Sequence, residues 1–442
     1  MNKDNKNRIR KVLAGLLIIG VSIGLGYCLF LATRPLIHGK EQVKMTMNEK
    51  NPKNQESVTG NNKEEKQVLN NSNKLTIGEL LAKQIEEEQR EKAQREERLK
   101  ETSQEPKRER TKVKGIYVSG PRAGSGKYMD DLIDIVDNTE LNTMVIDIKN
   151  DSGEITYDMN LPVVKEIKAN KNYIRNMEEL VRTLKEKNIY VIGRVVAFKD
   201  PVLAEKKPKL SIKNSNGTIF RDRSGLAWVN PYKKEVWDYL MDICKEAAQI
   251  GIDEIQFDYI RFSTDKGMKT VNFGKEARNK SKLEVITEFT KYAKETLSPL
   301  GIYVSADVYG AIIDSEVDAD IVGQSYVEMS KYLDYISPMV YPSHYADGSY
   351  GIPHPDLEPY KLILKSMEAS KAALDAIPED EDKAIVRPWL QDFTASWLKN
   401  HKSYNGKEIK DQIKAVYDAG YDEWILWNGS NKYTKSGLEL AK

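Results

Sequence analysis

The sequence contains little of what would define a metalloenzyme, a disulfide-bonded domain or a nucleic-acid-binding protein. It has 442 residues but only 2 cysteines and 4 histidines, and its formal net charge is +1. Cys28 and Cys244 lie too far apart, in an apolar run and a helical pattern, to predict a disulfide framework. So few histidines do not suit a histidine-rich metal centre, and we expect neither a metal nor a cofactor. Phosphate recognition needs a basic excess, so we expect no nucleic-acid partner.

Sequence motifs of several hydrolase and nucleotide-binding classes are missing as well. There is no HExxH, no HxH on the first predicted strand and no GxSxG, so zinc peptidases, metal-dependent amidohydrolases and α/β-hydrolases lack their catalytic groups here. Segment 119–127 (SGPRAGSGK) is rich in glycine but lacks GxGxxG, and Tyr128 stands where a Walker motif needs Ser or Thr. We interpret this segment as a loop with turn glycines.

One long apolar run lies near the N-terminus. Residues 1–11 are strongly basic, and residues 12–32 contain no charged residue. At 1.5 Å per residue, this run spans about 30 Å, the thickness of a bilayer core. A cleaved signal peptide would have a shorter apolar region that ends in a small-x-small cleavage site. Here bulky Phe30 lies two positions before Ala32, and Tyr27 before Cys28 does not suit a lipoprotein-type cleavage site. We therefore expect a transmembrane anchor, with the basic tail cytoplasmic and the rest of the chain outside the cell.

The composition changes after the apolar run. Residues 33–111 are dominated by Asn, Lys, Glu and Gln and have too few apolar residues to form a core. Within them, about 75–102 is built from strong helix formers, but its apolar positions stop after Ile85, so no coiled-coil seam is sustained. We interpret the segment as a polar, partly helical stalk, with a partner-binding helix as the alternative. The sequence does not predict an oligomeric state.

Residues 112–442 alternate strand-like and helix-like stretches. The strand-like stretches are rich in β-branched and aromatic residues and almost continuously apolar, as strands covered on both faces must be. The predicted strands are 115–119, 143–149, 190–198, 254–262, 302–310, 335–342, 384–393 and 423–430.

Amphipathic helical patterns separate these strands. Gly251, Gly301 and Gly420 stand before three of the strands, where a left-handed helix C-cap is wanted. The predicted helices are 129–140, 176–188, 234–250, 282–297, 326–333, 360–374 and 407–420, and the tail 437–442 could supply an eighth. Eight βα repeats predict an α/β protein with a (β/α)8 TIM barrel. The alternative, a doubly wound open sheet, usually carries a glycine-rich phosphate loop that is missing here.

Polar residues gather at the ends of the predicted strands. In a barrel the C-terminal strand ends meet at one mouth, where the chemistry takes place. Charged groups within apolar strands are costly unless they are paired, so such a cluster is a candidate site, although purely structural ion pairs are the alternative for any one residue. The cluster comprises Asp147, Lys149, Arg194, Asp258, Tyr259, Arg261, Asp307, Tyr341, His344, Trp389, Gln391, Asp392, Trp427 and Asn428.

These residue types favour cleavage of glycosidic bonds. That reaction needs one carboxyl group to protonate the leaving oxygen and a second to act as nucleophile or to activate water. Tryptophans and tyrosines at the mouth could stack on sugar rings, with packing of the mouth as the alternative. Asn428, Gln391 and Lys149 could bind hydroxyl groups, and Arg194 and Arg261 could hold the carboxylates ionised or bind an anionic substrate.

Four motifs occur in order along the predicted strands: VKGIYVSG, DEIQFDYIRF, YVSADVYG and LDYISPMVYPSHY. Together they resemble a bacterial family of glycoside-hydrolase-like proteins with an amylase-like TIM barrel, often found on anchored or secreted proteins. The resemblance covers 113–442 and does not include the anchor or the stalk.

The resemblance implies roles for particular residues. In amylase-like barrels the nucleophile is an Asp at the end of strand four, which corresponds to Asp258. The acid/base there is a Glu at the end of strand five, where this chain has Asp307, and a third carboxylate ends strand seven, where it has Asp392. The Arg two positions before the nucleophile is replaced by Gln256. Asp307 is the first choice for the acid/base, with Asp147, Asp392, Glu316 and Glu328 in reserve.

The sequence thus predicts a membrane-anchored extracellular glycoside hydrolase that acts on a cell-wall or other extracellular polysaccharide. Asp258 would be the nucleophile or charge stabiliser and Asp307 the acid/base. Two alternatives remain open at this point, a non-catalytic polysaccharide-binding barrel and a transglycosylase. The stereochemical outcome depends on the separation of the carboxyl groups, about 5 Å for retention and 6.5–9.5 Å for inversion.

Overall fold

The computed structural model describes residues 110–441. The predicted tail, the anchor 12–32 and the stalk with its helix at about 75–102 lie outside these residues. Among the helices of 110–441, none is long and apolar enough to cross a membrane.

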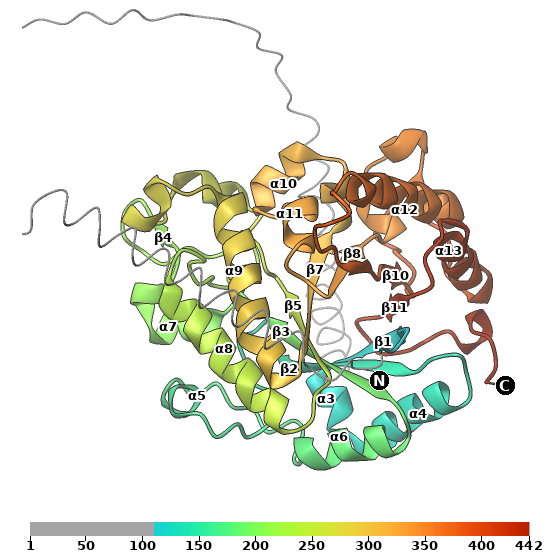
Figure 1. Ribbon diagram of the computed structural model, residues 1–442, viewed down its shortest axis with the longest axis horizontal. Helices are drawn as coiled ribbons and strands as arrows, with labels where there is room; N and C mark the ends of the chain where they lie inside the picture. Colours follow the sequence, from blue (N-terminus) through green and yellow to red (C-terminus); the bar gives the residue numbers. More distant parts are fainter. Residues whose placement is uncertain (1–109, 442) are drawn as a thin grey trace, which may run out of the picture. The chain divides into compact units, whose positions relative to one another are not determined.

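Parallel strands close into an eight-membered barrel, as predicted. The strand order is β10-β11-β1-β2-β3-β5-β7-β8-β9, and β10 also pairs with β8, which closes the ring (Figure 1). The strands are β1 (Lys114–Val118), β2 (Thr143–Lys149), β3 (Tyr190–Val196), β5 (Glu254–Asp258), β7 (Tyr303–Tyr309), β8 (Tyr335–Met339), β9 (Ile385–Val386), β10 (Trp389–Gln391) and β11 (Trp424–Trp427).

Two strands differ from the sequence-based expectation. The segment predicted as one strand over 384–393 is split into β9 and β10, because Pro388 between them has no N–H to donate to the sheet. The strand predicted over 254–262 ends at Asp258, because Tyr259 turns into the left-handed region with φ 48°.

Helices pack around the barrel where the amphipathic patterns predict them. Figure 1 shows α8 beside α9 and α12 beside α13. The longer helices are α4 (Gly126–Asp137), α6 (Met177–Glu186), α8 (Lys234–Gln249), α9 (Lys282–Leu297), α12 (Pro359–Asp375) and α13 (Gly406–Asp418), with short α3 (Gly120–Ala123), α5 (Pro162–Glu166), α10 (Glu316–Val322) and α11 (Tyr326–Ser330) between strands. Gly251, Gly301 and Gly420 all have positive φ, which confirms the predicted left-handed caps.

The helix suggested for the tail 437–442 is wrong. The described residues after β11 contain only a 3₁₀ turn at Lys435–Gly437, and Leu440 forms a single antiparallel bridge with Thr139. Six residues are too few to form a stable helix by themselves. Gly437 also packs against Ile409 of α13 so closely that a Cβ atom would lie 2.6 Å from it.

The sequence predicts a loop with turn glycines over the glycine-rich segment 119–127, but the structure makes most of it helical. It forms α3 and the start of α4. A Cβ atom on Gly124 would lie 1.8 Å from the carbonyl oxygen of Tyr173, so glycine is required there by a close backbone approach.

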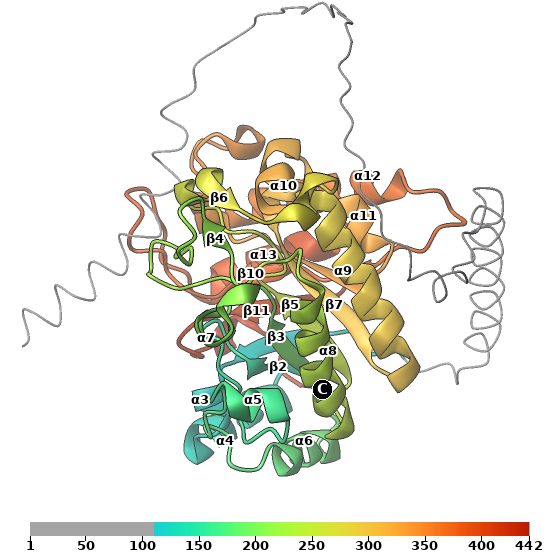
Figure 2. The same ribbon diagram turned by 90° about the vertical axis from the view of Figure 1, so that its left-hand side faces the viewer.

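A small lobe extends from the C-terminal side of the barrel. The long loops after β3 and β5 carry α7 (Pro201–Lys206), β4 (Lys213–Asn214) and β6 (Val271–Asn272), and β4 pairs with β6 in antiparallel fashion. Figure 2 shows this pair beyond the ends of the barrel strands. The lobe therefore adds a wall beside the barrel mouth.

The inside of the barrel follows the two-residue period of its strands. A small apolar cluster, which includes Tyr117, Val145, Ile192 and Ile425, fills the interior and is separate from the larger core between strands and helices. Above and below this apolar layer the inward positions are polar. In β5 the inward side chains are Glu254 at the bottom, Gln256 in the middle and Asp258 at the mouth, so one strand contributes to both polar layers.

The polar layer at the bottom is a buried ion-pair cluster. Arg387 donates to both oxygens of Glu254, at 2.9 and 3.1 Å, and to Glu423 at 3.0 Å. Its guanidinium also lies 3.8 Å from the centre of the Tyr335 ring. The three charged side chains are almost completely shielded from solvent. With no route for a substrate, this layer is structural.

Replacing Arg387 with Ala should destabilise the protein by about 3–5 kcal/mol, because Glu254 and Glu423 would be left buried and unpaired. The measurement is the free energy of unfolding in denaturant. The matched control is Arg182→Ala, which removes an exposed arginine from α6 and should cost less than about 1 kcal/mol. Equal effects of the two substitutions would contradict the structural role of the cluster.

Candidate active site

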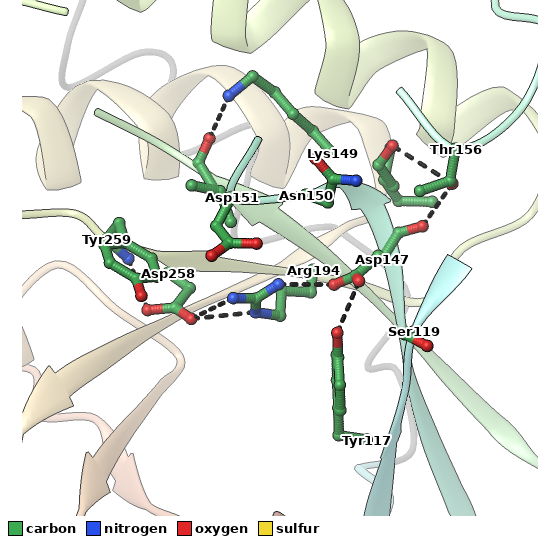
Figure 3. A network of polar contacts seen from close by, with 12 residues as sticks. Tyr117, Ser119, Asp147, Lys149, Asn150, Asp151, Thr156, Arg194, Asp258 and Tyr259 are labelled. Carbon is green, nitrogen blue, oxygen red and sulfur yellow. Dashed lines mark hydrogen bonds and ion pairs between the residues drawn. The ribbon is translucent and has the colours of Figure 1, made fainter. Parts of the chain in front are cut away.

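A buried arginine joins two carboxylates at the mouth of the barrel. Arg194 on β3 donates to Asp258 on β5 through Nε at 3.0 Å and Nη2 at 2.6 Å, and to Asp147 on β2 through Nη1 at 2.6 Å. Figure 3 shows the three side chains in one line. Burial alone disfavours the charged form of Arg194, but the two carboxylates raise its pKa well above the ordinary value. The cluster predicted from the strand ends therefore exists at this point.

Beyond Asp147, the row of contacting side chains includes two stacked aromatic rings. The Tyr117 hydroxyl on β1 donates to Asp147 at 2.7 Å, and the Tyr117 ring stacks on Trp427 of β11 with centroids 4.2 Å apart. The guanidinium of Arg194 lies 5.5 Å from the Tyr117 ring and 5.8 Å from the Trp427 ring. Burial raises the pKa of Asp147, and the nearby Arg194 opposes this effect. Four neighbouring strands thus fix the orientation of Arg194.

Asp258 is held from a second side by a strained turn. Tyr259 has φ 48°, which a non-glycine residue rarely adopts, and its backbone N–H donates to Asp258 Oδ1 at 2.6 Å. Arg194 binds the other oxygen, Oδ2. Strain of this kind persists at functional sites where the surrounding structure over-determines it. Both carboxylate oxygens are therefore fixed, and the side chain is presented in one orientation at the end of β5.

Asp307, at the mouth end of β7, differs from Asp258 because none of the described arginines and lysines forms an ion pair with it. It is 2% exposed, and Trp389 of β10 donates its indole N–H to Asp307 Oδ1 at 2.6 Å. Burial and the charge of Asp258 raise the pKa of Asp307 well above the ordinary value, while the Trp389 hydrogen bond and Arg194 act in the opposite direction. The folded environment therefore favours the protonated form of Asp307.

Tyr341 lies in the electrostatic field of both carboxyl groups. Burial raises its pKa well above the ordinary value, and Asp307 and then Asp258 add to the rise. The two acidic groups thus face one region of the mouth. Pairs of carboxyl groups whose environments hold them in different protonation states are typical of acid/base catalysts.

Several predicted site residues lie outside this region. Lys149 is fully buried, where it donates to the Val196 carbonyl at 2.7 Å and pairs with Asp200 at 2.9 Å. The register between β2 and β3 shifts between Asp147 and Lys149. The extra residue turns Lys149 to the other face of the strand, and in Figure 3 its amine points away from Arg194. Lys149 therefore does not bind sugar hydroxyl groups.

Gln391 and Asn428 also have structural partners. Gln391 is fully buried and bonds to Asp356, the Phe393 carbonyl and the Ser343 N–H. Asn428 donates to the carbonyl of Lys432 and to that of Asp392, which orders the turn after β11. Neither amide is free for a substrate hydroxyl.

Asp392, the carboxylate expected at the end of strand seven, has a structural role. Asp392 accepts from the Thr434 hydroxyl at 2.6 Å and from the Thr434 N–H at 2.9 Å, and it is 2% exposed. It therefore anchors the segment after β11.

Glu316 and Glu328, the other candidates for the catalytic acid, are exposed on α10 and α11. Trp389 is 1% exposed and positions Asp307, so its ring cannot stack on a sugar.

The exposed aromatic surface lies on the loops instead. The His344 ring is 5.2 Å from the Tyr341 ring and 6.4 Å from that of Phe393, and Phe393 stacks on Trp397 with centroids 5.9 Å apart. Trp397 is 42% exposed. Neither Phe393 nor Trp397 is among the predicted site residues. Phe393 ends the predicted strand 384–393 and Trp397 lies beyond it, although an aromatic residue after a barrel strand is itself a usable signal.

A second basic group, Arg261, lies among aromatic rings close to Asp258 in the sequence. Arg261 lies 4.9 Å from the Tyr259 ring and 4.5 Å from the Tyr309 ring. Lys199, missed by the sequence analysis, lies 4.6 Å from the Tyr259 ring and pairs with Asp151 at 3.1 Å. Within 110–441 no three His, Cys, Asp or Glu residues are grouped in a way that could hold a metal ion.

The chain belongs to a known domain family. The family model described as "Putative glycosyl hydrolase domain" matches residues 115–433, from β1 to beyond β11. The family confirms the resemblance seen in the sequence motifs, and it makes the barrel a glycosidase domain. Among curated proteins, no sequence matches.

Solved structures also resemble the barrel. The glycoside hydrolase domain of PgaB (BpsB) from Bordetella bronchiseptica is 13% identical, covers 72% of this chain and 94% of its own, and has a TM-score of 0.53, which supports the fold. A hypothetical protein from Ruminiclostridium thermocellum ATCC 27405 is 44% identical over 44% of this chain and 97% of its own, with a TM-score of 0.41. An alpha-amylase from Lactobacillus plantarum is 14% identical, covers 72% of this chain and 71% of its own, and has a TM-score of 0.45.

Asp307→Asn should stabilise the fold more at pH 8 than at pH 4. In the unfolded chain Asp307 ionises near pH 4, whereas burial and the charge of Asp258 raise its pKa well above that value in the folded protein. Rising pH therefore costs the wild type stability, and Asn does not titrate. The measurement is the thermal midpoint of both proteins across this pH range, with Asp130→Asn on the exposed face of α4 as control. A difference between wild type and Asp307→Asn that does not change with pH would contradict a protonated Asp307.

Proposed function

We propose that this protein hydrolyses glycosidic bonds in a cell-wall or other extracellular polysaccharide, with Asp258 and Asp307 as its two catalytic carboxyl groups. The proposal rests on the different environments of these two carboxyl groups at the same barrel mouth. Asp258 is bound by Arg194 through Oδ2 and by the Tyr259 N–H through Oδ1, whereas Asp307 is buried beside Trp389 with a raised pKa.

The two groups divide the reaction. Protonated Asp307 donates its proton to the leaving oxygen as the glycosidic C–O bond breaks. The Asp258 carboxylate stabilises the positive charge that develops on the sugar, or bonds to its anomeric carbon. Asp307, now ionised, accepts a proton from the water that attacks that carbon, and so regains its starting state. Arg194 positions Asp258 and keeps a positive charge beside it throughout.

The setting of the activity is proposed from the sequence. Residues 12–32 form a transmembrane anchor behind a basic cytoplasmic tail, and the stalk 33–111 holds the barrel away from the outer face of the membrane. An anchored enzyme of this kind meets polymers at the cell surface, which supports an extracellular polysaccharide as substrate.

Asp258→Asn should lower kcat by about 10³-fold or more, because the amide cannot stabilise or bond to the anomeric carbon. The measurement is the release of reducing ends from fractionated wall and extracellular polysaccharides. Asp130→Asn is again the matched control. Unchanged turnover in Asp258→Asn would remove Asp258 from the mechanism. A wild type that binds a polysaccharide but cleaves none would show a binding module, and products longer than the substrate would show a transglycosylase.

Trp397→Ala should raise KM about three- to tenfold with a smaller change in kcat. A stacking contact at an exposed subsite is worth about 1 kcal/mol, and it stabilises substrate and transition state alike. The control is Tyr128→Ala, which removes an exposed aromatic ring from α4. If both variants have the wild-type KM, the loop aromatics do not form a sugar subsite.

A further inference from the structure

Arg261 is a buried cation without an acidic partner. It is 8% exposed, and none of the carboxylates within 110–441 forms an ion pair with it. The other strongly buried cations of the barrel, Arg194, Arg387 and Lys149, each pair with a carboxylate. Buried charges are rarely left unpaired because their desolvation is costly. The missing partner is therefore a feature to be explained.

Aromatic rings hold the guanidinium of Arg261 in place. It lies 4.5 Å from the centre of the Tyr309 ring, 4.9 Å from that of Tyr259 and 5.2 Å from that of Trp228. Its one protein hydrogen bond joins Nη1 to the Phe262 carbonyl at 2.8 Å. Cation–π contacts fix the position of a cation without neutralising its charge. The remaining N–H groups have no protein partner, yet they are not sealed off from solvent.

The position of Arg261 places this charge at the mouth. It follows Asp258 by three residues, Tyr309 ends β7 two residues after Asp307, and Trp228 lies in the loop that leads from β3 to β5. The residue types leave two roles open for Arg261, holding a carboxylate ionised or binding an anionic substrate. The structure pairs Asp258 with Arg194 instead, so of these two roles the binding of an anionic substrate is the one that fits Arg261.

We propose that Arg261 binds an oxyanion carried by the sugar units next to the cleaved bond, and hence that the substrate is an acidic polysaccharide. A planar guanidinium with free N–H groups suits a carboxylate or a phosphate equally well. The shared chemistry is an oxyanion, from a uronic-acid unit or from a phosphate substituent. This inference rests on the proposed function and specifies its substrate class.

The test is equilibrium binding of small probes to the full-length chain by calorimetry. Glucuronate and glucose differ only in the carboxylate, and inorganic phosphate represents the phosphate source. Wild type should bind glucuronate or phosphate about tenfold or more tightly than glucose. Arg261→Gln should remove this preference, and Arg182→Gln, which removes an exposed arginine from α6, should keep it. Stronger binding of phosphate than of glucuronate would assign the phosphate source, and the reverse would assign the carboxylate.

A second variant separates binding from folding. Arg261→Lys keeps the charge and the apolar stem but loses the planar donor group, so the preference for anions should fall while binding of glucose stays unchanged. No preference of the wild type for either anion over glucose would overturn the proposal. It would also be overturned if Arg261→Gln, or Arg261→Lys should the former not fold, kept the full preference.

The outcome is distinguishable from a failure of the proposed function. If the wild type cleaves a polysaccharide but binds neither glucuronate nor phosphate more tightly than glucose, the hydrolase proposal stands and the anion site does not. If anions bind through Arg261 but no polysaccharide is cleaved, the anion site stands and the hydrolase proposal fails.

Discussion

The pairing of Arg194 with Asp147 and Asp258 is the interaction on which the barrel mouth depends. Three neighbouring strands each contribute one charged side chain to this cluster, and none of the three could be buried by itself without a large desolvation cost. Paired, they fix Asp258 through one oxygen, while the N–H of the strained Tyr259 fixes the other. The geometry of the proposed nucleophile is therefore a consequence of charge neutralisation inside the barrel.

Asp307 shows what the same environment does to a carboxyl group without a cationic partner of its own. Burial beside Trp389 and the charge of Asp258 raise its pKa well above the ordinary value. The raised pKa costs folding stability at any pH where the unfolded chain releases the proton more readily than the folded protein does. Two aspartates in one barrel can therefore be proposed for different roles, because the environment of each is determined by its neighbours and not by its residue type.

Charged groups at the two ends of the barrel have different consequences. At the bottom, Arg387 joins Glu254 and Glu423 in a layer without access for a substrate, and its role is stability. At the mouth, Arg261 is almost as well buried, but its contacts are aromatic rings and the Phe262 carbonyl, with no carboxylate of the described chain paired to it. An ion pair that is complete within the protein supports the fold, whereas a cation that lacks its partner is available to an anion from outside.

The sequence by itself determined the order of strands and helices, the left-handed caps at Gly251, Gly301 and Gly420, and the family, because periodicity, glycine positions and motifs are local properties. It also placed Asp258, Asp307 and Arg194 at the strand ends. Only the tertiary structure decided which residues meet there. A register shift in β2 turned Lys149 away, and partners distant in sequence occupied Gln391, Asp392 and Asn428. Pairing, burial and protonation depend on neighbours from other strands, and a linear sequence does not show those neighbours.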